Sequence, residues 1–141
     1  MTAPAGTLGR ASLHPGLLPA AVGVTAAAAC ATLLVVDPNR AGAYPTCPFL
    51  AVTGLQCPGC GTMRALHALL RLDMPAAVGF NVLTVALLPV LVWAWVAWWR
   101  HRTGRRPAPP RLSPRVGYAV AAVVPVFWVL RNLPAFAFLA P

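Results

Sequence analysis

Three long runs of apolar residues divide the chain, and each is long enough for a membrane-spanning helix. They cover residues 17–36, 75–99 and 116–131, and the first contains no charged residue. About 20 apolar residues cross the ~30 Å hydrocarbon core of a bilayer as a helix. Pro89 inside the second run predicts a kink, because proline removes a backbone donor. The pattern predicts an all-α integral membrane protein, a single domain over residues 1–141 with three transmembrane helices.

The segment between the first two runs changes character partway along. Residues 37–62 form a loop that contains three cysteines, and residues 63–73 have apolar positions at helical spacing. An amphipathic helix of this kind lies in the membrane interface. We therefore predict a short interfacial helix after the loop. Its apolar face is formed by Leu66, Leu69 and Leu70, and its cationic face by Arg64, His67 and Arg71.

Composition and charge agree with a membrane protein. The chain is 59% hydrophobic and 9% charged, whereas soluble domains carry about 25% charged residues. The net charge of +9 comes from eleven arginines against two aspartates. These arginines do not alternate with aromatic residues on a polar face, so nucleic-acid binding is not predicted. Six of them crowd into the linker 100–115, namely Arg100, Arg102, Arg105, Arg106, Arg111 and Arg115.

An arginine-rich linker between two spans is typical of a cytoplasmic loop. This orientation places the N-terminus with Arg10 inside, and it places the cysteine loop and the C-terminal tail outside the cytoplasm. The abundance of alanine and arginine without lysine is typical of high-GC bacteria, which predicts the bacterial inner membrane. The expected partners are the lipid bilayer, anionic headgroups at the linker, and another membrane protein.

The loop carries the chemistry, because Cys57-Pro58-Gly59-Cys60 follows Cys47 by ten residues. Proline presets φ at the second position of a turn and glycine accepts a positive φ at the third, which predicts a type II turn. Such a turn brings the two cysteines within about 7 Å. The pair then suits either chelation of a metal, zinc above all, or redox exchange.

A tetrahedral zinc site uses four ligands, and the loop offers only three cysteines. His67, two turns into the following helix, is the nearest candidate for the fourth, and the alternative is a solvated interfacial histidine. Thr62 is the expected N-cap of that helix. The helix amides and Arg64 are expected to stabilise a thiolate at Cys60.

Three readings of the cysteines remain open. A structural staple, either a disulfide or zinc, is preferred, since extracytoplasmic cysteine pairs tend to oxidise. Thiol–disulfide exchange by Cys57 and Cys60 with Cys47 resolving is the first alternative, because three cysteines leave one thiol unpaired. Metal binding for delivery is the second. Cys30 in the first apolar run is expected to be a small buried thiol, with a lipidated N-terminal cysteine as its alternative.

Three polar residues sit near the outer ends of the second and third spans. We expect Asp73 and Arg131 to form an ion pair with Asn81 hydrogen-bonding nearby, because polar groups at membrane depth seek partners. The alternative is that all three face water or headgroups. Pro75 is expected in the first turn of the second span.

The chain resembles the bacterial membrane family catalogued as domain of unknown function 2752. The resemblance implies a small multi-pass membrane protein and supplies no activity, substrate or catalytic residue. In two places the chain departs from the family, which tends to have Gly where Leu72 stands and Pro where Val82 stands. The residues that carry the resemblance are Cys47-Pro48, Thr53-Gly54, Cys57-Pro58-Gly59-Cys60-Gly61, Arg64-Ala65, Leu69, Asp73 and Asn81, with a tail from Arg131 to Pro141.

No constellation typical of a hydrolase or transferase is present in the sequence, neither a Ser-His-Asp set nor a carboxylate pair nor a phosphate-binding glycine loop. The preferred function is therefore non-enzymatic: a membrane subunit or assembly factor whose outer loop is stapled through sulfur.

Overall fold

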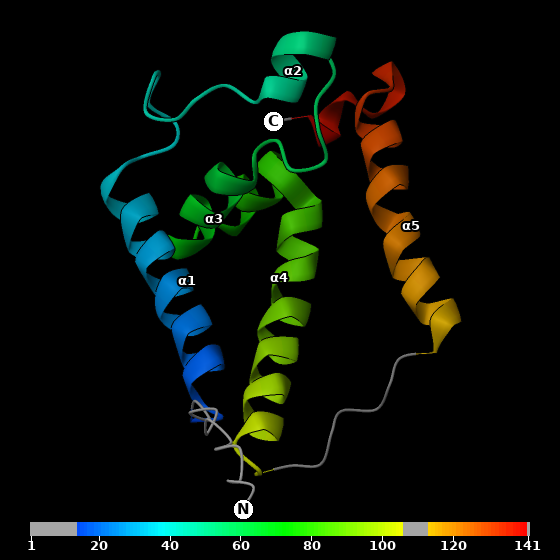
Figure 1. Cartoon of the computed structure of the whole chain (residues 1–141). Coiled ribbons are helices and arrows are strands. Elements are labelled where there is room, and N and C mark those ends of the chain that lie inside the picture. The colour runs from blue at the N-terminus through cyan, green and yellow to red at the C-terminus, as the bar shows by residue number, and fades with distance from the viewer. Residues whose placement is uncertain (1–13, 106–112, 141) are drawn as a thin grey trace, which may run out of the picture.

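The computed structural model describes residues 14–105 and 113–140, and this part of the chain is helical without strands. Its long helices run along the molecule, and its short elements gather at one end (Figure 1). The prediction of an all-helical protein is confirmed for these residues. The long helices are α1 (Leu17–Val35), α4 (Met74–Arg102) and α5 (Pro114–Arg131); the short ones are α2 (Pro48–Thr53), α3 (Thr62–Leu70) and the 3₁₀ helix η1 (Pro134–Leu139).

The long helices coincide with the three apolar runs. Helices α1 and α4 are long and apolar enough to cross a membrane, and α5 contains the shorter apolar stretch Gly117–Arg131. Only 11% of the most apolar stretch of α1 and of α4 is buried within the protein. These helices therefore present apolar side chains outward, unlike the core helix of a soluble domain.

Three of the predicted charges, Arg10, Arg106 and Arg111, lie outside the described residues, and so does Pro141 at the end of the tail. The arginines at the end of α4, Arg100 and Arg102, and the nearby Arg105 are exposed. They lie at the opposite end of the long helices from α2, α3 and η1 (Figure 1). The described arginines at the end of α4 and the cysteine loop are thus separated by most of the length of α4.

Helix α3 packs closely on α4 through small side chains. Ala65 on α3 and Ala77 on α4 have no exposed surface, and Ala68 is 6% exposed. Small residues let two helix backbones approach closely. The leucine face predicted for this helix, by contrast, remains partly exposed. The helix also ends at Leu70, earlier than the predicted Asp73.

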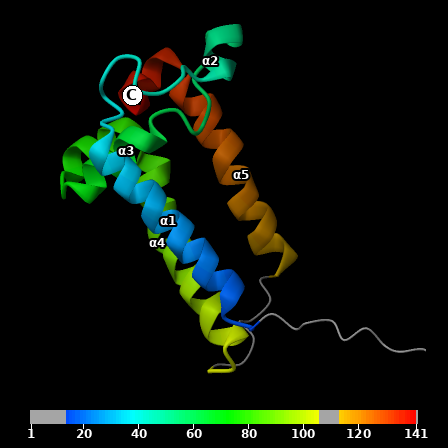
Figure 2. The ribbon, with the colours of Figure 1, turned by 60° about the vertical axis from the view of Figure 1, so that its left-hand side comes forward.

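Helix α1 is attached to the rest of the protein near both of its ends (Figure 2). Near its start, the indole of Trp95 on α4 donates a hydrogen bond to the Pro19 carbonyl at 3.1 Å. The same ring lies over Gly23, where an added Cβ would come within 2.7 Å of it. Near the other end, His67 contacts the Leu33 carbonyl at 2.7 Å. This contact satisfies one of the carbonyls that a helix C-terminus leaves without a partner.

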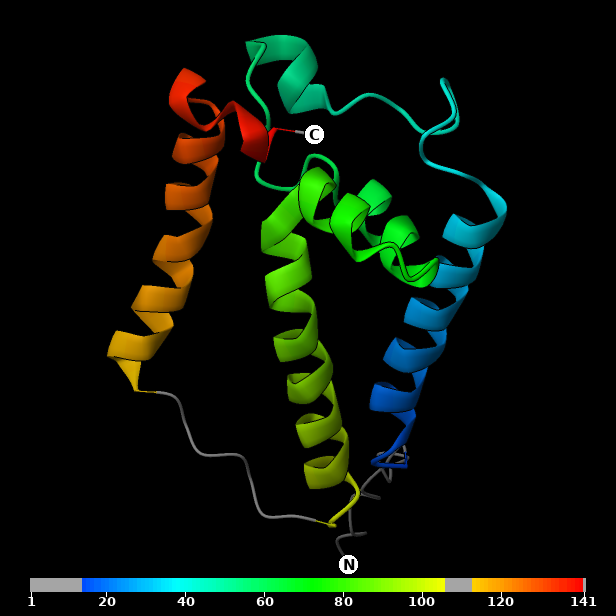
Figure 3. The same cartoon turned by 180° about the vertical axis from the view of Figure 1, so that it is seen from behind.

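The predicted kink lies elsewhere in α4. The residue with non-helical backbone is Asn81, at φ −164° and ψ 95°, whereas Pro89 lies within the helix. The chain changes direction near the start of α4 (Figure 3). The physical reason is that the side chain of Asn81 is buried and bonded to the cysteine turn, which holds its backbone in the extended conformation.

The connection from α3 to α4 contains a strained residue. Leu72 has φ +62°, in the left-handed region that costs a side chain about 1–2 kcal/mol and costs glycine little. Leu72 is one of the two positions where the chain departs from the family, which tends to have Gly here. The turn ends at Asp73, whose carboxylate accepts a hydrogen bond from the Ala76 amide at 3.0 Å and caps α4. Pro75 lies in the first turn of α4, as predicted.

Replacing Leu72 by Gly is expected to stabilise the protein by about 0.5–1 kcal/mol, because the strain is removed at some cost in chain entropy. Little packing is lost, since Leu72 is 91% exposed. The matched control is Leu72→Ala, which removes the side chain but keeps the Cβ. Thermal unfolding midpoints in detergent micelles should rise for Gly alone. An equal rise for both variants would show that the leucine side chain, and not φ, is unfavourable.

Candidate metal centre and its cavity

Three cysteines from the loop come together where α4 begins and α5 ends. The sulfur atoms of Cys47, Cys57 and Cys60 all lie within 4.8 Å of one another. Sγ of Cys57 lies 3.6 Å from Sγ of Cys47 and 3.0 Å from Sγ of Cys60. All three residues are partly buried. The fourth cysteine, Cys30, lies within α1, apart from this cluster.

The turn that joins Cys57 to Cys60 forms, but it is not of type II. The Cys60 amide donates to the Cys57 carbonyl at 3.1 Å, which closes the turn. Gly59 does not take a positive φ, whereas Gly61 does, at +83°. A type I turn has negative φ at both central positions, and its central peptide is flipped relative to type II. The flip directs the Pro58 carbonyl toward the hydrogen-bond donors described next.

The buried guanidinium of Arg131 supports this turn from α5. Its Nη1 donates to the carbonyls of Cys57, Pro58 and Cys60 at 3.1, 3.3 and 3.2 Å, and its Nη2 donates to Oε1 of Gln56 at 3.2 Å. The side chain is 2% exposed, and its guanidinium carbon stands 5.0 Å from the ring centre of Phe127. A single arginine therefore fixes the carbonyls of the whole turn.

Asn81 supports the same turn from α4. Its Nδ2 donates to the Pro58 and Cys60 carbonyls, each at 3.0 Å, and its Oδ1 accepts from the Thr84 amide at 3.0 Å. Thr62 begins α3 rather than capping it, because Gly61 holds the cap position. The Thr62 hydroxyl instead lies 2.9 Å from that of Thr84. The break in α4 at Asn81 thus connects α4 to the cysteine turn.

A further contact ties the start of the turn to the end of α5. The Gln56 amide donates to Oδ1 of Asn132, and Nδ2 of Asn132 donates back to the Gln56 carbonyl, both at 2.9 Å. The sequence analysis included Asn132 only as part of the family-like tail, and it predicted no role for Gln56. The available signal was the pair Arg131-Asn132 directly after an apolar run, where polar side chains need partners.

The thiols differ in how readily they ionise, and the difference is the reverse of the prediction. The Leu50 amide and the Cys57 thiol lower the pKa of Cys47. Burial and the neighbouring Cys57 thiol raise the pKa of Cys60 to about 12. The expected stabilisation of a Cys60 thiolate by α3 and Arg64 is therefore wrong. Cys47, just before α2, has the amide contact that was expected at Cys60.

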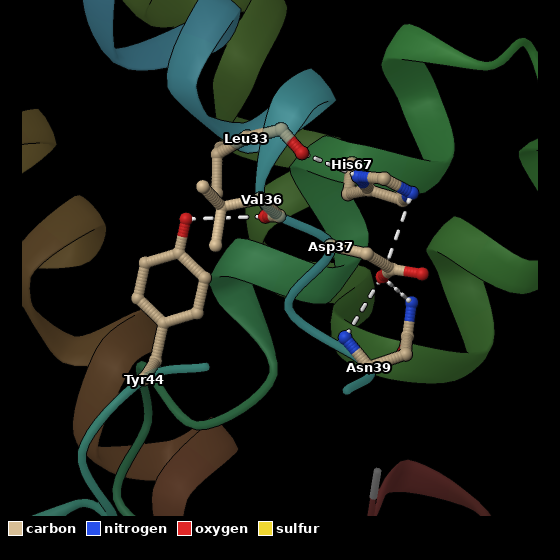
Figure 4. A network of polar contacts seen from close by, with 6 residues as sticks. All are labelled: Leu33, Val36, Asp37, Asn39, Tyr44 and His67. Atoms are coloured by element: carbon tan, nitrogen blue, oxygen red, sulfur yellow. Dashed lines mark hydrogen bonds and ion pairs between the residues drawn. The ribbon is translucent and has the colours of Figure 1, made fainter. Parts of the chain in front are cut away.

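His67 does not belong to the cysteine cluster. It is 5% exposed, so it is not the solvated histidine of the alternative reading either. Its Nδ1 must donate to the Leu33 carbonyl, and its Nε2 lies 3.7 Å from Oδ1 of Asp37 (Figure 4). The side chain instead connects α3 to the end of α1.

The expected pair between Asp73 and Arg131 does not form among the described residues. Asp73 caps α4, and Arg131 donates to the carbonyls of the turn. The physical reason is that a helix N-terminus already supplies Asp73 with a partner, while the turn supplies Arg131 with several. Of the predicted polar set, Asn81 and Arg131 meet at the cysteine turn, and Arg64 is exposed nearby.

The three cysteines line a cavity of about 650 Å³ that is open to the outside. Its other walls come from the segment after α1 and from the first turn of α3, including Arg40, Tyr44 and Arg64. The segment after α1 is shaped by Asp37, which accepts from the Asn39 amide at 2.9 Å, and by the Tyr44 hydroxyl, which donates to the Val36 carbonyl at 3.2 Å (Figure 4). Arg40 was not singled out from the sequence.

The donor set suits a soft metal ion. Zinc–thiolate bonds of about 2.3 Å place tetrahedral sulfurs ~3.8 Å apart. The Cys47 and Cys57 sulfurs are close to this at 3.6 Å, whereas the Cys57 and Cys60 sulfurs, at 3.0 Å, would have to move apart. Within the described residues, no histidine or carboxylate joins the three sulfurs. The set would therefore hold the ion through three protein ligands and leave one position for another donor, as open zinc sites do.

Comparison with known proteins places the cysteine turn inside a family segment. The searches of curated proteins and of solved structures found no match. The model of a family described as a protein of unknown function (DUF2752) matches residues 47–95, which run from Cys47 through most of α4. The match confirms the resemblance to DUF2752 over the segment that holds all three clustered cysteines and Asn81.

Proposed function

We propose that this chain is a small multi-pass membrane protein in which Cys47, Cys57 and Cys60 bind one soft metal ion, preferably zinc, as a structural staple. The observation that carries the proposal is the convergence of three thiols within 4.8 Å. A disulfide would join two of these sulfurs and leave the third, whereas a metal ion uses all three. We regard the protein as a membrane subunit or assembly factor rather than an enzyme.

The buried charge of Arg131 supports the metal reading. A guanidinium that is 2% exposed needs a compensating negative charge, because an unpaired buried charge is costly. Its hydrogen-bond partners are uncharged. A divalent ion with three thiolates carries a charge of −1, which Arg131 balances across the turn. The arginine and the metal site are thus electrostatically matched.

The staple would join the outer elements to the long helices. Cys47 begins α2, and the Cys57–Cys60 turn is fixed to α4 by Asn81 and to α5 by Arg131. The role of the metal here is to hold α2 and the loop in place. The resulting outer surface, rather than a catalytic step, is what another membrane protein would recognise.

The membrane placement is also part of the proposal. We infer three transmembrane helices, α1, α4 and α5, in a bacterial inner membrane, with α3 in the outer interface. Two observations support it: α1 and α4 are long, apolar and mostly exposed, and the arginine-rich and cysteine-rich ends lie at opposite ends of α4 (Figure 1). The N-terminus and the arginine linker would face the cytoplasm, with the linker on anionic headgroups.

Thiol–disulfide exchange is the second candidate function. It is favoured by the 3.0 Å separation of the Cys57 and Cys60 sulfurs and by the lowered pKa of Cys47. Cys47 would then attack a Cys57–Cys60 disulfide formed by a membrane oxidant, which forms one S–S bond and releases one thiolate. Metal delivery uses the same three ligands and differs only in how fast the ion leaves.

Protein purified in detergent under reducing, chelator-free conditions should contain about one zinc ion per chain, because three thiolates hold the ion. Elemental analysis measures the content. Serine at Cys47, Cys57 or Cys60 should abolish stoichiometric metal, whereas Cys30→Ser should leave it unchanged as the matched control. Metal-free protein that carries a Cys57–Cys60 disulfide, detected by thiol-blocking mass spectrometry, would instead support exchange chemistry.

Arg131→Gln should weaken zinc affinity about 10–100-fold, as loss of a supporting contact to a metal site typically does. The zinc affinity of Arg131→Lys should lie between those of wild type and Arg131→Gln, because lysine keeps the charge but lacks the fork of donors. Chelator competition measures the affinities. Arg71→Gln, at an exposed position after α3, is the control. Wild-type affinity in both Arg131 variants would contradict the electrostatic argument.

Membrane sidedness can be read from cysteine labelling in intact cells. After mild reduction and chelation, an impermeant maleimide should add three labels, at Cys47, Cys57 and Cys60, because these side chains are expected outside. A Thr103→Cys variant should gain a further label only after lysis, since Thr103 follows α4 at the arginine-rich end. Mass spectrometry counts the labels. Labelling of the three loop cysteines only after lysis would reverse the orientation.

A further inference from the structure

We propose that the cavity beside the cysteine cluster binds a small organic acid that carries a thiol: the sulfur takes the fourth position on the metal, and Arg40 and Arg64 hold the acid groups. The inference rests on the proposed metal site and adds a ligand class to it. Its support comes from the shape of the cavity, the direction in which the metal site is open, and the charges around it.

The cavity has the size of a ligand site. Its volume of about 650 Å³ falls within the ~300–1,000 Å³ typical of small-molecule pockets. All three sulfur-bearing residues line it, together with Arg40 from the segment after α1 and Arg64 from the first turn of α3. These two arginines come from different elements and converge on one space beside the sulfurs.

Among the described residues, the three cysteines of the metal site face this cavity. On its other side, the cysteine turn is covered by Arg131 and Asn81, which are 2% and 1% exposed and bond to the turn carbonyls. Neither residue lines the cavity. A fourth ligand to the metal must therefore arrive from the cavity side.

The cavity also carries a surplus of positive charge. No aspartate or glutamate lines it; the nearby Asp37 interacts electrostatically with Arg40 but lies outside the lining. The metal with three thiolates carries −1, Arg131 balances that charge, and the two cavity arginines add +2. Each guanidinium can bind one carboxylate through paired hydrogen bonds, so a ligand with two acid groups suits the two arginines.

The fourth ligand should itself be sulfur. An ion already held by three soft thiolates prefers another soft donor over a hard oxygen. A thiol attached to a dicarboxylic acid supplies both requirements in one small molecule. Mercaptosuccinate is the simplest probe with this combination.

The test uses full-length protein in nonionic detergent, loaded with Co²⁺, whose sulfur-to-metal charge-transfer absorption reports bound thiolates. Mercaptosuccinate should raise this absorption by about a third, because four thiolates replace three. It should act at a concentration at least ~10-fold below that of 2-mercaptoethanol, which lacks the charge-assisted contacts of the acid groups. Succinate should leave the absorption unchanged. Cobalt retained on the protein is measured in parallel by elemental analysis.

Variants separate the two parts of the site. Arg40→Gln and Arg64→Gln should each weaken mercaptosuccinate binding about 10-fold, because each removes a charge-assisted contact, without changing the response to 2-mercaptoethanol. Arg71→Gln, exposed and outside the cavity, should bind like wild type.

Two failures are distinguishable. If Co²⁺ gives no thiolate charge transfer before any acid is added, the metal site itself is refuted. If Co²⁺ binds normally but mercaptosuccinate adds no absorption or strips the metal, the metal site stands and the organic-acid site is refuted. The same holds if Arg40→Gln and Arg64→Gln bind mercaptosuccinate as well as wild type does.

Discussion

The cysteine-bearing end of the protein depends on one interaction, the guanidinium of Arg131 on the carbonyls of the cysteine turn. It is nearly fully buried and contacts three carbonyls of one short segment, those of Cys57, Pro58 and Cys60. Hydrogen bonds from charged groups contribute about 1.5–3 kcal/mol each, but only if the carbonyls point the same way. That requirement selects a type I turn, and the turn in turn directs the sulfurs of Cys57 and Cys60 toward the cavity side.

The break in α4 follows from the same requirement. Asn81 reaches the Pro58 and Cys60 carbonyls that Arg131 also contacts, and it does so from within a helix. A regular helix at this point would leave no extended residue to aim the amide at the turn. The break in the helix is offset by three contacts of the Asn81 side chain, with the Pro58 and Cys60 carbonyls and the Thr84 amide. Beside them, the Thr62 and Thr84 hydroxyls connect α3 to α4. A polar residue within an apolar helix is here the anchor of the site.

The long helices and the clustered cysteines could be predicted because both depend on local sequence patterns. The length of an apolar run predicts α1 and α4, and the close spacing of two cysteines predicts the turn. Sequence reasoning did not find the partners of His67 and Arg131, since each partner lies on another element whose packing the pattern does not encode; for Asp73 it missed a local partner, the Ala76 amide at the start of α4. The type of the turn was wrong for the same reason. Pro58-Gly59 allows either type, and buried donors from α4 and α5 decide between them. Leu72 is the opposite case: the departure from Gly marked a position that the backbone strains.

The scarcity of apolar packing around the outer elements is the strongest reason for a cross-link there. Within the described residues, neither α2 nor η1 has a buried residue; the rings of Phe49 on α2 and Trp128 on α5 meet edge-on, with centres 5.8 Å apart. Small units that cannot bury enough apolar surface rely on disulfides or metals instead. Cys47 at the start of α2 is placed where such a link has most effect. A bond from its sulfur to the turn would transfer the rigidity supplied by Arg131 and Asn81 to a helix with few other contacts to hold it.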